Sequence, residues 1–121
     1  MKKSLLLLTI LLITIFSFSW SDWKVLKTDN FKVFYQEPYE WFARETIMNL
    51  EFYRPYLEKL TGNSIKDFPI VIEDIGRVSN GFADSFFKRI KLYTNTPSNE
   101  SLGAIENWSR LVSGHEFTHM L

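Results

Sequence analysis

The chain contains only two histidines, and both lie in the motif His115-Glu116-Phe117-Thr118-His119. Residues four apart lie on one face of an α-helix, so the two imidazoles can act together only if this segment is helical. Two imidazoles at this spacing can bind a single tetrahedral zinc ion. Phe117 and Thr118 are uncharged, which allows the helix to be buried beside its ion. The motif therefore predicts a partly buried helix.

Glu116 follows His115 directly, and its side chain projects about 100° round the helix from that histidine. It would lie beside a bound metal ion and not on it. A carboxylate in that position can act as the general base for a metal-bound water. The simpler alternative is that the two histidines merely share a helix face and that Glu116 is solvated.

The motif helix has a recognisable start. Asn107 is a residue type that caps helix N-termini, and the helix is predicted to run from Trp108 through Leu121. Trp108, Leu111 and Val112 give it apolar side chains with which to dock on the rest of the chain.

The composition limits what else the chain can do. Its 121 residues allow one domain at most. Fourteen basic and fourteen acidic side chains give zero net charge, so we do not expect nucleic acid as a partner. There is no cysteine, so any metal must be held by histidine and carboxylate side chains. The oligomeric state cannot be predicted from these features.

The first part of the chain has the layout of a secretory signal peptide. Lys2 and Lys3 precede an apolar run from Leu5 to Phe16, and Ser17-Phe18-Ser19 offers a small-x-small cleavage pattern. The run is shorter than the roughly 20 residues that span a membrane. We therefore predict a signal peptide over residues 1–21 and a secreted or periplasmic location for residues 22–121.

An uncleaved N-terminal membrane anchor is the alternative, because Phe16, Phe18 and Trp20 extend the apolar stretch. The chain would then contact the membrane through this segment alone. A lipid-anchored lipoprotein is excluded, since no cysteine follows the run.

Alternation of apolar and polar residues predicts the first strands. Phe31, Val33 and Tyr35 alternate with Lys32, Phe34 and Gln36, and residues 23–28 alternate loosely. The turn signal Asp29-Asn30 lies between the two stretches. The β-branched run 68–74 predicts a buried strand.

A hairpin is predicted over residues 80–94. Residues 89–94 alternate with period two, which is typical of a strand with one wet face. Asn80-Gly81 marks a tight bend that leads into the hairpin, and we interpret it as a turn in preference to a substrate contact.

A long helix is predicted between the strands. Pro38 can open it at the position where a missing N–H costs nothing, and Gly62 can end it. Pro55 is expected to kink the helix or split it. Six apolar residues recur at helical spacing, and we predict that this stripe packs in the core. The stripe consists of Trp41, Phe42, Met48, Phe52, Tyr56 and Leu60.

With this motif present, the sequence resembles the gluzincin class of zinc metallopeptidases, and it looks most like secreted prokaryotic peptidases of the MA-like type. The resemblance covers roughly Phe31 to Leu121. Only H-E-x-x-H is highly specific, and the rest is the order and spacing of the other segments. These are strand 31–35, the long helix, strand 70–72, Asn80-Gly81-Phe82-Ala83, strand 90–93 and Trp108 with the motif.

The resemblance implies an α+β fold. A twisted mixed or antiparallel sheet would pack on the long N-terminal helix and on the C-terminal zinc-binding helix. Residues 22–121 would form the N-terminal part of a metallopeptidase domain that is incomplete because it ends after the H-E-x-x-H helix.

The resemblance also implies the chemistry. His115 and His119 would be ligands of one zinc ion, and Glu116 would be the general base in the hydrolysis of a peptide or protein substrate. The strand Ile90–Thr94 would form the sheet edge beside the cleft, so that Ile90, Leu92 and Tyr93 would bind substrate. An ordinary half-exposed strand is the alternative there.

The third zinc ligand of this class is a glutamate on a later helix, and here only two residues follow His119. We therefore expect the ligand downstream of Leu121 in a longer protein, and little or no activity from this chain alone. Glu73 or Asp84 could supply it in principle, although nothing in the spacing favours either. The alternatives to an enzyme are an inactive peptidase-like binding or remnant fragment and a membrane-tethered interaction protein.

Overall fold

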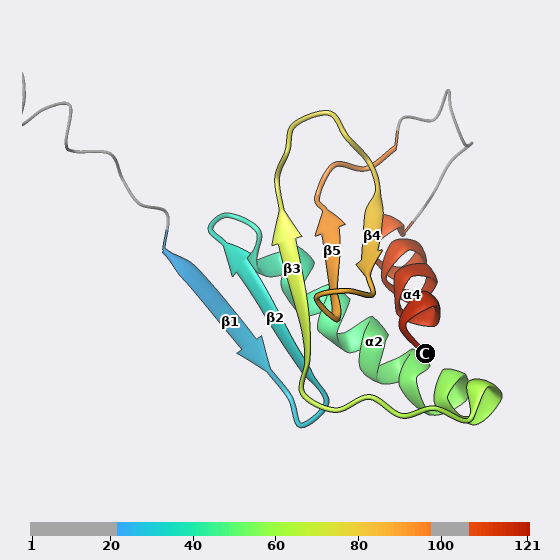
Figure 1. Cartoon of the computed structure of the whole chain (residues 1–121). Coiled ribbons are helices and arrows are strands. Elements are labelled where there is room, and N and C mark those ends of the chain that lie inside the picture. Colours follow the sequence, from blue (N-terminus) through green and yellow to red (C-terminus); the bar gives the residue numbers. More distant parts are fainter. Residues whose placement is uncertain (1–21, 98–106) are drawn as a thin grey trace, which may run out of the picture.

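The computed structural model describes residues 22–97 and 107–121 (Figure 1). The predicted signal peptide or anchor over residues 1–21 lies outside these ranges. Within them, no helix combines the length and the apolar character that a membrane span requires.

The described chain forms a five-stranded mixed sheet and two helices. The strands are β1 (Trp23–Lys27), β2 (Phe31–Gln36), β3 (Phe68–Glu73), β4 (Gly81–Asp84) and β5 (Arg89–Tyr93), and the helices are α2 (Glu40–Thr61) and α4 (Trp108–Met120). The strand order is β1-β2-β3-β5-β4. β2, β3 and β5 run parallel, whereas β1 and β4 pair antiparallel at the two edges. The expected α+β fold and its strands are thus confirmed.

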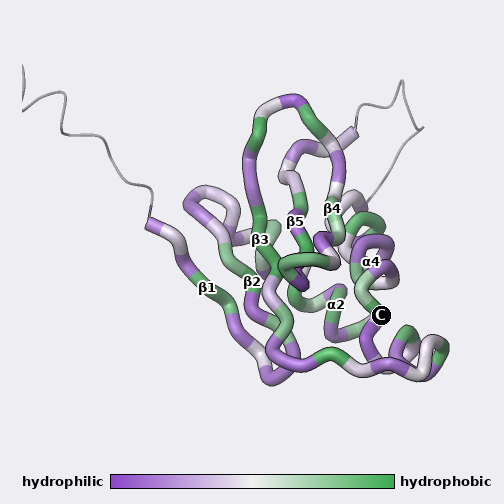
Figure 2. The backbone as a smooth tube through the Cα atoms, viewed as in Figure 1, coloured by the Kyte–Doolittle hydropathy of each residue, from purple (hydrophilic) through white to green (hydrophobic). Residues whose placement is uncertain are grey.

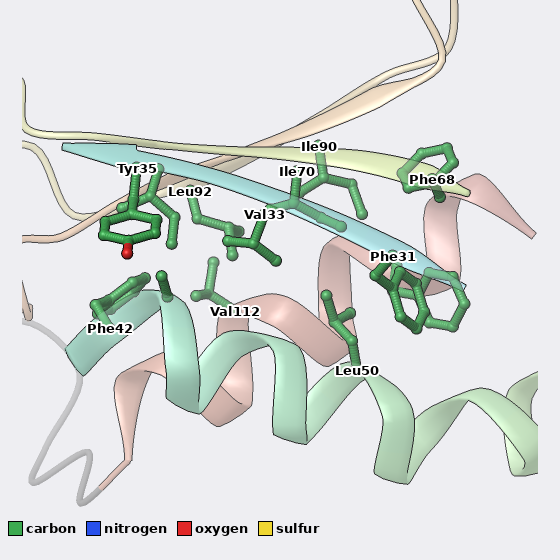
Figure 3. Packing of buried hydrophobic residues seen from close by; sticks show 13 residues of the cluster. Phe31, Val33, Tyr35, Phe42, Leu50, Phe68, Ile70, Ile90, Leu92 and Val112 are labelled. Carbon is green, nitrogen blue, oxygen red and sulfur yellow. The ribbon is translucent and has the colours of Figure 1, made fainter. Parts of the chain in front are cut away.

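One face of the sheet forms the core with both helices. Hydrophobic and hydrophilic residues alternate along the strands (Figure 2), and every second side chain of β2, β3 and β5 is buried. These buried side chains are Phe31, Val33, Tyr35, Phe68, Ile70, Ile72, Ile90 and Leu92. Figure 3 labels all of these except Ile72 and shows the labelled side chains opposite Phe42 and Leu50 of α2 and Val112 of α4. Each fully buried aliphatic or aromatic side chain contributes about 1.5–3 kcal/mol, so this face accounts for much of the stability.

The ends of α2 confirm one prediction and correct another. Gly62 ends the helix in the left-handed conformation, and its N–H donates to Glu58 O at 2.9 Å. Pro38 does not open the helix, because it lies in a turn in which the Tyr39 N–H donates to Gln36 O at 2.8 Å. α2 is also not split at Pro55, which lies on the exposed side of one continuous helix.

The predicted core stripe of α2 is wrong. Phe42 is buried, but the other five residues are exposed, with Leu60 at 80% and Met48 at 67%. Successive residues of a helix are about 100° apart, so the side chains of Trp41 and Phe42 point in different directions. A single stripe that packs on the sheet cannot include both residues. The side that packs on the sheet instead runs through Phe42, Ala43, Thr46 and Leu50. α2 thus carries an apolar face that is not covered by other described residues; it comprises Trp41, Met48, Phe52, Tyr56 and Leu60.

α4 packs on the sheet through large side chains and on α2 through small ones. The Phe117 ring meets Phe31 edge-on, with ring centroids 5.3 Å apart. Towards α2, the Ser109 hydroxyl donates to Glu45 Oε2 at 2.7 Å. Gly114 lies so close to the Tyr53 ring that a Cβ there would be 3.0 Å from a ring carbon.

The start of α4 confirms the predicted cap. The Asn107 side chain accepts a hydrogen bond from the Arg110 N–H at 3.0 Å, and the helix continues to Met120.

The loop between β3 and β4 is held at its start. The Tyr39 hydroxyl donates to the Asp74 carboxylate, and the Gly76 N–H donates to Asp74 Oδ1 at 2.9 Å. The hydrogen bond from Tyr39, and then that from Gly76, hold the pKa of Asp74 below its ordinary value. The bond to Asp74 raises the pKa of Tyr39, to which burial also contributes. These contacts join the beginning of α2 to the loop that leads into β4.

Truncation of a side chain should affect stability strongly on the buried face of α2 and little on its exposed face. Leu50→Ala should lower the free energy of unfolding by about 3 kcal/mol, because it opens a cavity under β2. Met48→Ala should change it by less than about 0.5 kcal/mol, because the side chain is mostly in solvent. Urea unfolding monitored by circular dichroism measures both. Equal losses in the two variants would contradict the assignment of the buried face.

Candidate metal and catalytic site

The two histidines of α4 lie on its exposed side. The His115 Nε2 and His119 Nε2 atoms are 3.2 Å apart, and the ring centroids are 4.8 Å apart. Two imidazole nitrogens that bind one tetrahedral ion at about 2.05 Å lie about 3.3 Å apart. The observed pair therefore fits a shared zinc ion in both donor type and spacing.

Glu116 lies on the buried side of the same turn, about 100° round the helix from His115. The residue is 7% exposed, yet its Oε1 is only 3.9 Å from His115 Nε2. The carboxylate is thus packed inside the protein on one side and reaches the histidine pair on the other. This placement does not match the alternative of a solvated Glu116.

Gly81 of β4 makes room for Glu116. A Cβ at Gly81 would be 2.5 Å from Glu116 Cγ and 2.6 Å from Val112 Cγ2, so no other residue fits without a shift. The backbone of β4 therefore touches the side chain of Glu116. The expected tight bend at Asn80-Gly81 is wrong, because Gly81 is the first residue of β4 and the bend of this loop lies at Gly76 and Arg77. The Asn80 Oδ1 accepts from the Gly81 N–H at 2.9 Å. The interpretation of Asn80-Gly81 as a turn missed this contact, although a glycine within a strand is itself a signal for close approach.

The two upstream carboxylates considered as a third ligand are occupied elsewhere. Glu73 Oε1 is 3.0 Å from Lys91 Nζ, and Asp84 Oδ2 is 3.4 Å from Arg89 Nε. Across residues 22–97 and 107–121, no three histidine, aspartate or glutamate side chains are grouped so that they could hold a metal ion. The described part of the site therefore consists of two donors and one neighbouring carboxylate.

Comparison of the chain with protein-family models, with curated proteins and with solved structures gives no match. The residues of the site and their geometry are therefore the basis on which a function can be proposed.

The expected edge position of the strand Ile90–Thr94 is wrong. β5 lies between β3 and β4, so its main-chain groups pair on both sides. The Ile90 and Leu92 side chains are fully buried in the core. The Tyr93 carbonyl accepts from the Trp108 indole N–H at 3.3 Å. The strand order could not be predicted, because it depends on a parallel pairing between segments far apart in the chain.

β4 is the sheet edge next to α4 (Figure 1). The Tyr93 N–H donates to Asn80 O at 3.0 Å, which identifies Asn80 and Tyr93 as a hydrogen-bonded pair. Hydrogen-bonded pairs alternate along an antiparallel ladder, so the N–H and C=O groups of Gly81 and Ala83 point away from β5. The Gly81 N–H donates a hydrogen bond to the Asn80 side chain and is therefore not free to pair with another strand. The N–H and C=O of Ala83 remain directed to the outer side of the edge.

The contact at Gly81 can be tested by a double-mutant cycle. Gly81→Ala should destabilise the protein by about 1–3 kcal/mol, because the new methyl group overlaps Glu116 and Val112. Val112→Ala removes one of the two obstructions at the cost of a cavity. In the double variant the loss should be smaller than the sum of the single losses, as measured by urea unfolding. Strictly additive losses would show that the two residues do not compete for the same space.

Proposed function

We propose that this chain is the N-terminal part of an exported zinc metallopeptidase. His115 and His119 are two of its zinc ligands, and Glu116 is its general base. The observation that carries the proposal is the convergence of the two Nε2 atoms at 3.2 Å, with the Glu116 carboxylate 3.9 Å from one of them. The donor spacing fits a tetrahedral ion, and a carboxylate beside the donors is what a base requires.

When bound, zinc would supply a Lewis acid that polarises the scissile carbonyl and increases the acidity of a water molecule. Glu116 would accept the proton of that water and pass it on to the leaving amine. Its side chain is only 9% exposed, so bulk water does not compete for the carboxylate on its buried side. The close approach of Gly81 to the Glu116 side chain limits the space that this side chain can occupy.

The third ligand in this proposal is a glutamate downstream of Leu121 in a longer protein. The two histidines alone would bind zinc weakly, and the chain by itself would have little or no activity.

The edge of β4 is the proposed site for the substrate main chain. An extended peptide can add to a sheet edge through main-chain hydrogen bonds. The N–H and C=O of Ala83 face outward, next to the helix that carries the histidines. A peptide paired with Ala83 would lie alongside the histidine pair and Glu116.

A non-catalytic, peptidase-like binding fragment is the second candidate. Two observations favour it. The described residues bring together two donors and not three, and α2 carries an uncovered apolar face of the kind that marks interaction sites. This second candidate function predicts that even the full-length protein does not hydrolyse peptides.

The role of Glu116 is tested in the full-length protein that carries this chain. Glu116→Gln should lower the rate of hydrolysis of dye-labelled casein by about 10²- to 10⁴-fold, because the amide cannot accept the proton. Zinc content, measured with a chromogenic chelator, should stay at one ion per chain. Glu37→Gln, an exposed carboxylate outside the site, is the matched control and should retain full activity.

His115→Ala and His119→Ala complete the test, since each should release zinc. Retained hydrolysis in Glu116→Gln would remove the general base from the proposal. Unchanged zinc content in both histidine variants would remove the metal site itself.

The edge of β4 can be tested by removing a single donor. Ala83→Pro deletes the outward N–H and leaves the donors of the β4–β5 ladder in place, at an edge position that tolerates proline. The KM for a peptide substrate should rise about five- to tenfold, with a smaller change in kcat, because one main-chain hydrogen bond is lost. Ala83→Ser keeps the N–H and is the control. An unchanged KM in Ala83→Pro would exclude pairing at this position.

A further inference from the structure

A hollow of about 440 Å³ lies at the C-terminal end of α4. It is bounded by the segment after α2, by the β4–β5 turn and by the last residues of α4, which lie towards the same end of the molecule in Figure 1. The polar side chains that line it are Ser64, Lys66, Ser85, Lys88 and His119. His119 therefore belongs both to the histidine pair and to the wall of this hollow.

The hollow is basic. Lys66 and Lys88 line it, and none of its lining residues is acidic. Among the described residues, neither lysine forms an ion pair. Both ammonium groups are thus available to an anionic ligand.

The nearest acidic residues along the chain have other partners. The Asp67 carboxylate pairs with Lys32, and its other oxygen is 3.7 Å from Lys27 Nζ. Glu58 is 2.9 Å from Arg54 Nη1 and accepts from the Ser64 hydroxyl at 3.1 Å. Neither carboxylate pairs with Lys66 or Lys88.

The turn that carries Lys88 is held in place. The Phe87 N–H donates to Asp84 Oδ1 at 3.0 Å, and Arg89 pairs with the same carboxylate. Lys88 itself has a φ of 49°, in the left-handed region that favours glycine. Turn geometry thus does not account for a lysine at this position, whereas a ligand of the hollow would use its charge.

We infer that this hollow is a subsite for an acidic residue of the peptide substrate, with Lys66 and Lys88 as the specificity-determining side chains. The inference rests on the proposed peptidase function. β4 continues directly into Ser85, so a peptide paired along Ala83 passes the mouth of the hollow. Because His119 forms part of the wall, the acidic residue lies within a few positions of the scissile bond.

The test compares peptide binding in the full-length protein with Glu116→Gln, so that peptides bind without being cut. The probes are fluorescein-labelled hexapeptides of alanine and leucine that carry one Glu, or one Gln as the neutral match, at each position in turn. Fluorescence anisotropy should show a roughly five- to tenfold preference for Glu at one position. The preference should decrease as the salt concentration rises.

Lys66→Ala combined with Lys88→Ala should abolish this preference, so that the Glu and Gln peptides bind equally well. Lys59→Ala removes the same charge from the exposed end of α2 and should retain it. Equal binding of Glu and Gln peptides by the protein with both lysines would overturn the inference. A preference that survives in the double variant would overturn it as well.

Zinc affinity, measured on the same proteins by chelator competition, separates the two proposals. If zinc binds and the peptides do not differ, the subsite is wrong and the metallopeptidase proposal stands. If zinc does not bind, the metallopeptidase proposal fails, and the Glu and Gln peptides still decide whether the two lysines select an acidic residue.

Discussion

β4 lies so close to α4 at Gly81 that a single methyl group there would overlap both Glu116 and Val112. At this contact the edge strand of the sheet packs directly against α4, the helix that carries the motif. The contact buries Glu116 and leaves His115 and His119 on the exposed side, because residues of one helical turn face different directions. The separation of a buried carboxylate from two accessible imidazoles thus follows from how one strand meets one helix.

The same contact places the sheet edge beside the histidines. With β4 against α4, the outward N–H and C=O of Ala83 and the turn that carries Lys88 both lie next to the motif. Three features with different chemistry therefore meet at one end of α4: two neighbouring imidazoles, a strand edge and a basic hollow. In the proposed peptidase these would bind the ion, the substrate main chain and one substrate side chain.

Several features that depend on local interactions could be predicted. The Asn107 cap, the Gly62 helix end and the alternating strands each involve residues close together in the chain, and all were confirmed. The stripe of α2 was misassigned because a helix with two apolar sides does not reveal which side meets the sheet. The edge strand was misassigned because strand order depends on pairing between distant segments.

The spacing of His115 and His119 determined that both imidazoles share a helix face, and the zinc ion stays a prediction from their residue type. Only the tertiary structure decided that Glu116 is buried, that Gly81 makes the space for it, and that Lys66 and Lys88 line one hollow. The physical reason is the distance along the chain between the residues that interact. Helical periodicity acts over four residues, whereas these contacts join segments that come together only when both helices cover one face of the sheet.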